Sequence, residues 1–140
     1  VFDSAQDDSL VNLDVRGLHA VCSYIGIPFN YRVCSELNLQ LSSKPAPGDW
    51  ALELCSLVGA TSYVNPESGR DLFDLQEFER CGINLYFART KEYAYNTAPY
   101  QYEPFLSMID VLMWNAPASV HEAVRNGLEL TKAATVTSSL

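Results

Sequence analysis

The sequence lacks long hydrophobic runs and has few basic side chains. Its uninterrupted apolar stretches are only a few residues long, so we expect no segment that spans a bilayer. Nine Lys and Arg stand against 17 Asp and Glu, which gives a formal net charge of −8. Because a surface without a basic excess repels a phosphate backbone, nucleic acid is excluded as an expected partner.

Metal-binding and nucleotide-binding patterns are also missing. The four cysteines are not arranged in the close pairs that zinc sites use, and no glycine-rich fingerprint or phosphate loop occurs. Each of Cys22, Cys34, Cys55 and Cys81 lies in an apolar stretch, which favours buried free thiols in a reducing cytosol over disulfides. The sequence therefore predicts no metal and no other cofactor.

Histidine is scarce as well. His19 and His121 both lie in segments predicted to be helical, and no nearby Ser, Cys or carboxylate pattern marks either one as a base. We expect both imidazoles to face solvent or to form structural hydrogen bonds.

What is present is an ordinary globular composition. The chain has 140 residues, of which 48% are hydrophobic and 19% charged, so it can bury a core of its own. We expect one domain over residues 1–130 and a flexible tail over residues 131–140.

Helical and strand patterns alternate along the chain. A helix capped by Asn12 or Asp14 ends at Gly26, and a helix capped by Asp49 ends at Gly59. The apolar residues of the first predicted helix recur at three- and four-residue intervals and are Val11, Val15, Leu18, Cys22 and Ile25. The other predicted helices cover residues 49–59, 75–80, 104–115 and 118–129, and the predicted strands cover residues 28–34, 61–64 and 83–88.

Helix followed closely by strand, three times over, predicts an α/β fold with a small, mainly parallel sheet covered by helices and with further helices at the C-terminus. Three strands are few for such a sheet. This shortage favours either an absent N-terminal piece or pairing with another chain, including formation of a homo-oligomer.

The first candidate site is the turn that follows the predicted strand at residues 61–64. Asn65, Ser68 and Gly69 lie at the carboxyl end of this strand, where open α/β sheets place their ligand crevices. Their short polar side chains and backbone amides could hold an anion. The alternative is a plain turn, because Asn, Pro, Ser and Gly are all common in turns.

The second candidate is Asp110, in a predicted helix that is apolar on almost every side and is therefore expected to be buried. A carboxylate in such surroundings needs partners or a raised pKa, and either outcome suits catalysis or binding. Ser107 and Trp114 share its helical face. The alternative is a structural Asp that fixes the helix to a neighbouring segment.

Two weaker candidates complete the set. Ser35 and Glu36 follow the predicted strand at residues 28–34, and the favoured interpretation is that Ser35 caps a turn while Glu36 and the nearby Lys44 are solvated. Tyrosines, among them Tyr95, cluster in the loop at residues 89–103, where their rings could stack on a sugar or close the core.

Two segments resemble the WbqC-like family, whose members are found in bacterial O-antigen and related surface-polysaccharide gene clusters. Residues 63–74, Tyr-Val-Asn-Pro-Glu-Ser-Gly-Arg-Asp-Leu-Phe-Asp, resemble a strand, turn and Leu-aromatic-Asp segment of that family. Residues 104–115, Pro-Phe-Leu-Ser-Met-Ile-Asp-Val-Leu-Met-Trp-Asn, resemble its most distinctive helix. The similarity extends over about residues 9–128.

The sequence also departs from the family. The opening strand and Gln-Pro loop of other members have no counterpart, so an N-terminal portion is expected to be missing. The family's Tyr-x-Gln reads Tyr95-Asn96-Thr97 here, so a ligand contact by that Gln is not carried over.

The resemblance implies a cytoplasmic protein of surface-polysaccharide assembly that acts on a small-molecule activated sugar or acyl donor, as a glycine, aminoacyl or sugar-modifying transferase. A non-catalytic binding or scaffold module beside a transferase is the alternative. Position and resemblance together assign Asp110 as the catalytic base or orienting carboxylate. The substrate-binding candidates are Asn65, Ser68, Gly69 and Ser107, with Ser35, Glu36 and Tyr95 at the rim.

Overall fold

The computed structural model describes residues 9–42, 46 and 48–134. Its contacts divide the chain into two compact units. The helical unit contains residues 9–32 and 92–127, and the sheet unit contains residues 33–91 and 128–134. The predicted boundary of a single domain over residues 1–130 stays a prediction.

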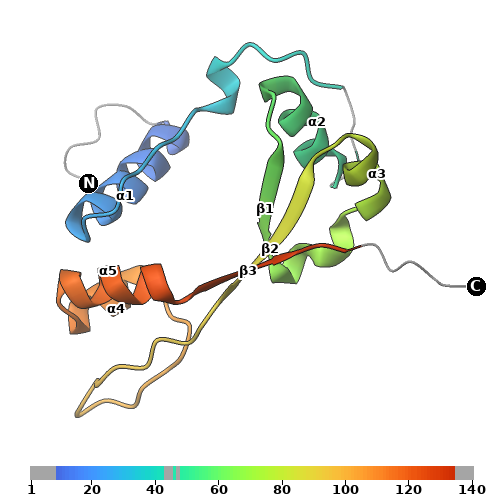
Figure 1. The fold of residues 1–140 in the computed structure, drawn as a ribbon. Coiled ribbons are helices and arrows are strands. Elements are labelled where there is room, and N and C mark those ends of the chain that lie inside the picture. Colours follow the sequence, from blue (N-terminus) through green and yellow to red (C-terminus); the bar gives the residue numbers. More distant parts are fainter. Residues whose placement is uncertain (1–8, 43–45, 47, 135–140) are drawn as a thin grey trace, which may run out of the picture. The chain divides into compact units, whose positions relative to one another are not determined.

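The sheet unit contains three strands in the order β1-β2-β3. β1 (Ser62–Pro66) runs parallel to β2 (Asn84–Thr90), and β3 (Leu128–Lys132) runs antiparallel to β2 (Figure 1). Between β1 and β2 the chain forms a 3-10 helix, η2 (Glu67–Leu72), and α3 (Leu75–Arg80). This crossover confirms the helix–strand repeat predicted for this stretch.

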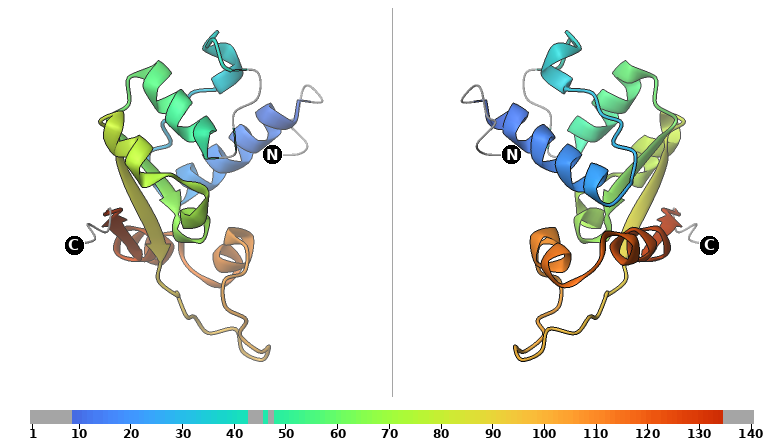
Figure 2. Two further views of the ribbon diagram at one scale, coloured as in Figure 1. Left: turned by 90° about the vertical axis from the view of Figure 1, so that its right-hand side faces the viewer. Right: turned by 90° about the vertical axis from the view of Figure 1, so that its left-hand side faces the viewer.

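The core of the sheet unit lies between β2 and the helices. Leu85 and Phe87 alternate with half-buried residues along β2, as the period of two predicts, and Phe87 is only 1% exposed. Phe78 of α3 and Cys55 of α2 (Asp49–Val58) complete the cluster. Both views of Figure 2 show α2 and α3 beside the two parallel strands.

The sheet is mixed, and the prediction of a mainly parallel sheet is therefore only partly correct. The sequence pattern does not predict β3, because the predicted last helix extends to residue 129 and the expected tail begins at residue 131. All residues of this edge strand are exposed, so no burial pattern distinguishes it from a surface segment. Thr131 and Lys132 belong to β3, and residues 135–140 of the expected tail lie outside the described residues.

The strand predicted at residues 28–34 is wrong. Residues 27–33 carry no strand assignment, and Cys34–Glu36 form a short 3-10 helix, η1. Alternation of bulky and polar side chains marks an extended segment, but a strand also requires a neighbouring backbone that accepts its hydrogen bonds. Stacking of the Phe29 and Tyr31 rings, with centroids 5.0 Å apart, accounts for the pattern instead.

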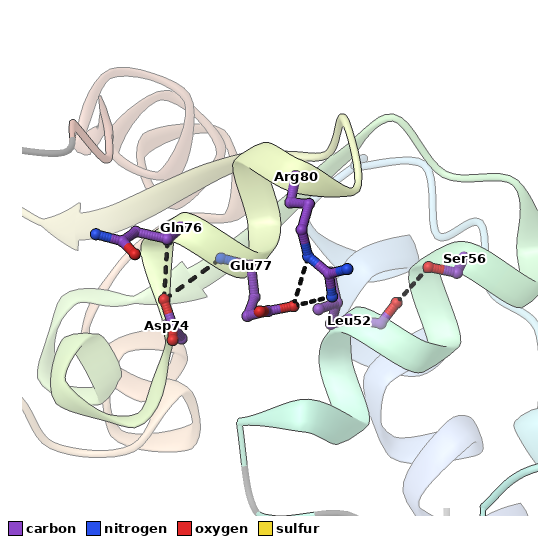
Figure 3. A network of polar contacts seen from close by, with 6 residues as sticks. All are labelled: Leu52, Ser56, Asp74, Gln76, Glu77 and Arg80. Carbon is purple, nitrogen blue, oxygen red and sulfur yellow. Dashed lines mark hydrogen bonds and ion pairs between the residues drawn. The ribbon is translucent and has the colours of Figure 1, made fainter.

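Helix ends followed the expected chemistry at some positions only. Gly59 ends α2 with φ +69°, as predicted for a left-handed stop. Asp49, predicted as the cap of that helix, is its first residue and accepts a hydrogen bond from the Ala46 amide at 3.1 Å. Asp74 caps α3 through hydrogen bonds from the Gln76 and Glu77 amides (Figure 3).

The helical unit contains α1 (Leu10–Tyr24), α4 (Met108–Trp114) and α5 (Pro117–Asn126). α1 starts one turn earlier than the predicted caps, because Ser9 Oγ accepts a hydrogen bond from the Asn12 amide. His121 Nδ1 lies 2.8 Å from the Ile25 carbonyl oxygen, which ties α5 to the end of α1. The expectation of a structurally bonded histidine is confirmed at this position.

The prediction of a buried helix at residues 104–115 is wrong. α4 has only seven residues, and Ile109 and Met113 are 68% and 78% exposed. α4 packs against α5, but two turns of helix give most of its apolar side chains no described surface to bury against. Asp110 is consequently half-buried rather than enclosed.

All four cysteines are free, as expected, but their burial varies. Cys55 is buried, and this raises the pKa of its thiol. Cys34 and Cys81 are exposed, so the prediction of uniformly buried thiols is wrong. Among the described residues, none of the helices combines the length and the apolar character needed to cross a bilayer.

Candidate functional site

The structure brings two of the predicted site residues together in the helical unit. The Tyr95 hydroxyl donates a hydrogen bond to Asp110 Oδ2. Tyr95 lies in the loop between Glu92 and Ser107, and Asp110 lies in the first turn of α4. Asp110 Oδ1 has no hydrogen-bond partner among the described residues, so one carboxylate oxygen is fixed while the other is available to a ligand.

This pairing changes the acidity of the tyrosine. The hydrogen bond to Asp110 is the largest cause, followed by desolvation, and together with nearby charges they raise the pKa of Tyr95 to about 12. The phenol therefore stays protonated at neutral pH and acts as a donor. Of the two groups, the carboxylate is the one that can accept a proton from a substrate.

Three further tyrosine contacts shape the loop around this pair. The Tyr93 hydroxyl donates to Asn115 Oδ1 at 3.2 Å, and the Tyr102 hydroxyl donates to the Tyr93 carbonyl oxygen at 3.2 Å. The rings of Tyr95 and Tyr102 meet at 87° with centroids 5.2 Å apart. These contacts position the aromatic rings on the loop as well as closing it against α4.

A shallow pocket of about 300 Å³ opens on the same loop. Three tyrosine rings and the intervening backbone line it, through Tyr95, Asn96, Thr97, Ala98, Pro99, Tyr100 and Tyr102. Thr97 is buried, and its hydroxyl donates to the Tyr100 carbonyl oxygen at 3.1 Å, which fixes the turn of the loop. We call this the tyrosine pocket.

Ser107, predicted to contact substrate, has a local structural task. Its Oγ accepts a hydrogen bond from the Ile109 amide at 3.0 Å and caps α4. Asp110 is the third residue of the helix, so Ser107 and Asp110 form a Ser-x-x-Asp pattern typical of helix starts. This pattern could have been read from the sequence. The Asp110 side chain nevertheless bonds to Tyr95.

The predicted turn site lies in the sheet unit. η2 follows the carboxyl end of β1, as expected for a crevice beside parallel strands. Asn65 Oδ1 accepts a hydrogen bond from the Tyr63 hydroxyl at 3.2 Å, and Asn65 Nδ2 donates to the Pro66 carbonyl oxygen at 2.9 Å. A Cβ atom on Gly69 would lie 2.3 Å from Asn65 Nδ2, so Gly69 admits a close approach.

Ser68 differs from its two neighbours at this turn. It is exposed, and its hydroxyl has no hydrogen-bond partner among the described residues. The nearby Arg70 guanidinium lies 4.1 Å from the centre of the Phe87 ring and also pairs with Glu67 at 3.7 Å. Arg70 is thus the cation of this turn, and the sequence interpretation did not single it out.

The last pair, Ser35 and Glu36, lies in η1 of the sheet unit. Both side chains are exposed and form no hydrogen bond or ion pair within the described ranges. The expectation of a solvated Glu36 agrees with this geometry, whereas the expected cap by Ser35 is wrong. A role of either residue at the rim of a site stays a prediction, and Lys44 lies outside the described residues.

The predicted site residues therefore belong to different units. Tyr95, Asp110 and Ser107 lie in the helical unit, whereas Asn65, Ser68, Gly69, Ser35 and Glu36 lie in the sheet unit. Asn115, which holds Tyr93, is the site residue that sequence reasoning overlooked, although its place directly after a helix end is a capping signal. In the portion that the structure describes, no group of three or more His, Cys, Asp or Glu is placed to hold a metal ion.

Comparison with known proteins identifies the family. The model of the WbqC-like protein family matches residues 1–122, which is most of the chain, so the chain belongs to this family. No curated protein and no solved structure matches.

Proposed function

We propose that this member of the WbqC-like family acts in the biosynthesis of surface polysaccharide, as a transferase that uses an activated sugar or acyl donor. The transferred group would be glycine, another aminoacyl group or a sugar modification. Family membership supports the pathway, and the Tyr95–Asp110 pair supports the chemistry. The same proposal places the protein in the cytoplasm, where activated donors are made.

The observation that carries the proposal is the half-exposed Asp110 carboxylate, fixed at one oxygen by Tyr95. A general base must be held within hydrogen-bond reach of the proton that it removes. Asp110 Oδ1 would accept the proton from a hydroxyl or amine of the acceptor as that group attacks the donor. The bond between the transferred group and the donor's activating group then breaks, and the activating group leaves with the electron pair of that bond. Tyr95 would keep the carboxylate oriented without competing for the proton, because its own pKa is about 12.

The other proposed residues have supporting roles. Ser68 is the best remaining candidate for a substrate contact, since its exposed hydroxyl is not used internally by the described residues. Ser107, Asn65 and Gly69 would act mainly by holding backbone geometry, which their present contacts already do. Ser35 and Glu36 of η1 stay proposed substrate contacts of the sheet unit.

The test combines a donor screen with a matched pair of variants. Asp110→Asn keeps a hydrogen-bond acceptor for Tyr95 and removes the base, while Glu103→Gln removes an exposed carboxylate elsewhere on the same loop. The full chain is screened by thermal shift against nucleotide sugars and acyl donors, and transfer is then assayed with the stabilising donor. We expect Asp110→Asn to abolish transfer while its melting temperature changes by less than about 4 °C. Glu103→Gln should retain transfer, and a fully active Asp110→Asn variant would refute the role of base.

A second candidate function is a non-catalytic module that binds a sugar or a transferase. The observation that favours it is that the bond between Tyr95 and Asp110 also anchors the loop to α4. Under this alternative no donor is turned over by the wild-type chain, and Asp110→Ala, which removes the acceptor of the Tyr95 hydroxyl, lowers the melting temperature strongly. The same two measurements therefore separate the candidates.

A further inference from the structure

The loop that carries the tyrosine pocket and the helix α4 that follows it contain negative charges only. From Glu92 to Asn115 the sequence contains three carboxylates, Glu92, Glu103 and Asp110, and no Lys, Arg or His. Two of these carboxylates act directly on tyrosines that line the pocket. Asp110 accepts a hydrogen bond from the Tyr95 hydroxyl. The pKa of Tyr102 is raised first by its own desolvation and second by the charge of Glu92. The potential at the pocket therefore favours a positive charge over a negative one.

Tyrosine residues form much of the pocket lining. Tyr95 and Tyr102 stand at 87° to each other, and both line the pocket with Tyr100. The hydroxyls of Tyr95 and Tyr102 are held by Asp110 and by the Tyr93 carbonyl oxygen, so both side chains are fixed at their tips. Tyr100 contacts Trp114 of α4 edge-on, with centroids 6.1 Å apart.

Perpendicular aromatic rings beside carboxylates are the arrangement that binds ammonium groups. The face of a tyrosine ring is negative and attracts a cation within about 6 Å of its centre, and a carboxylate adds direct attraction. A phosphate would be repelled by the same carboxylates. A neutral sugar ring would gain stacking alone, without using the charge of the loop.

We propose that the tyrosine pocket binds a protonated primary amine carried by a substrate, with Tyr95, Tyr100 and Tyr102 in its lining. Asp110 does not line the pocket, and it acts through the Tyr95 hydroxyl, to which it is bonded, as the source of negative charge behind the wall. This inference rests on the proposed function because it uses the same carboxylate, and it names the part of the substrate that the site recognises. The amine could belong to an amino sugar or to an amino-acid derivative. The phosphates of an activated donor would lie outside the pocket.

Amide chemical shifts of the full chain provide the test. Glucosamine and alaninamide are titrated separately, each against its N-acetyl form, which removes the charge and adds an acetyl group. We expect at least one amine to shift the amides of residues 95–102 and its acetylated control to bind at least about fivefold more weakly. The amine that binds identifies the source, and added salt should weaken its binding.

Two variants link the binding to the pocket. Tyr100→Leu removes a wall residue that is 71% exposed, so folding does not depend on it, and Tyr31→Leu is the matched control on an exposed tyrosine outside the pocket. Tyr100→Leu should weaken amine binding by about two- to fivefold, and Tyr31→Leu should leave it unchanged. Asp110→Asn should weaken it by at least about fivefold.

Each contrary outcome overturns the inference. Equal binding of amine and acetylated forms would show a site for neutral rings, and absence of shifts at residues 95–102 with every probe would show that the pocket binds no amine. In both cases the proposed function still stands if Asp110→Asn abolishes transfer. If the amine binds normally but Asp110→Asn retains transfer, the role of Asp110 as the base fails and amine recognition stands.

Discussion

Each of the two units is stabilised internally by a different kind of interaction. In the sheet unit, buried aromatic and aliphatic side chains from α2, α3 and β2 form one contiguous cluster. In the helical unit, Ile25 and Val120 are the buried hydrophobic residues among those described, and many large apolar side chains of α1 and α4 are exposed. There the loop and helices are joined by hydrogen bonds from Tyr93, Tyr95 and Tyr102.

This difference shows that the most stable packing and the Asp110 site belong to different units. Apolar burial is non-directional and tolerates little loss of volume, so the sheet unit provides a rigid framework. Hydrogen bonds and ring contacts are directional, and each contributes only a small net stability. The helical unit can therefore present polar groups such as Asp110 at its surface, and it should be the less stable of the two.

Removing core volume is the largest expected effect. Phe87→Ala should lower the free energy of unfolding by about 3–5 kcal/mol, and Val120→Ala, in the helical unit, by about 2 kcal/mol, because both side chains are 1% exposed. Native-state hydrogen exchange measures where protection is lost. Phe87→Ala should expose amides of β1, β2 and α3, and Val120→Ala those of α5. Equal loss of protection in both units for either variant would show that they unfold together.

The next largest effect concerns Gly69 of η2, which lies close to the Asn65 side chain. Gly69→Ala should destabilise the sheet unit by about 1–3 kcal/mol, because its Cβ would displace the Asn65 amide from its hydrogen bonds. Chemical denaturation measures the change. Asn65→Ala removes the side chain that the new Cβ would meet. The variant with both substitutions should therefore lose no more free energy of unfolding than Asn65→Ala alone. Strict additivity would contradict this steric explanation.

Replacing the N-terminal caps of α3 and α4 should have a smaller effect on stability, and the two caps can be compared directly. Asp74 accepts two amide hydrogen bonds at the start of α3, whereas Ser107 accepts one at the start of α4. Replacement by Ala should cost about 1–2 kcal/mol for Asp74 and about 0.5–1 kcal/mol for Ser107. Thermal unfolding of the two variants tests the order. A larger loss for Ser107→Ala would show that α4 contributes more to stability than its exposure indicates.

The smallest effect is the titration of Tyr95. The folded pKa of Tyr95 is about 12, above its ordinary value of about 10, so the stability from its bond to Asp110 is fully present below about pH 10 and is lost as the pH rises through about 12. The ultraviolet absorbance of tyrosinate follows this titration. Asp110→Asn should return the pKa of Tyr95 toward 10, while Glu103→Gln should not. An unchanged titration in Asp110→Asn would exclude the bond in solution.

Sequence patterns succeeded where the cause is local. The α3 helix was predicted with its bounds, and the parallel pairing of β1 with β2 follows from a short crossover that allows few other arrangements. Gly59 was predicted as a stop because a left-handed backbone favours glycine at that point. At the candidate site, the sequence indicated Asp110 as an unusual carboxylate and Tyr95 as a residue at the rim, without predicting the bond between them.

Patterns failed where a partner distant in the sequence decides the outcome. Residues 27–33 have strand-like alternation, but no strand is assigned there, and β3 is a strand because β2 lies beside it. The helix at residues 104–115 was expected to be buried from its composition, yet burial depends on which surfaces are available to cover it. The bond between Tyr95 and Asp110 joins residues 15 positions apart and has no local sequence signal.

The sequence by itself determined the acidic character of the chain, its family, and the local stops and starts that divide it into helices and strands. Those properties depend on side chains and on backbone preferences within a few residues. Tertiary structure alone decided that Asp110 is half-exposed and held by a tyrosine, that β3 completes a mixed sheet, and that the predicted site residues fall in two units. Each of these depends on contacts between segments far apart in the chain, which no local preference specifies.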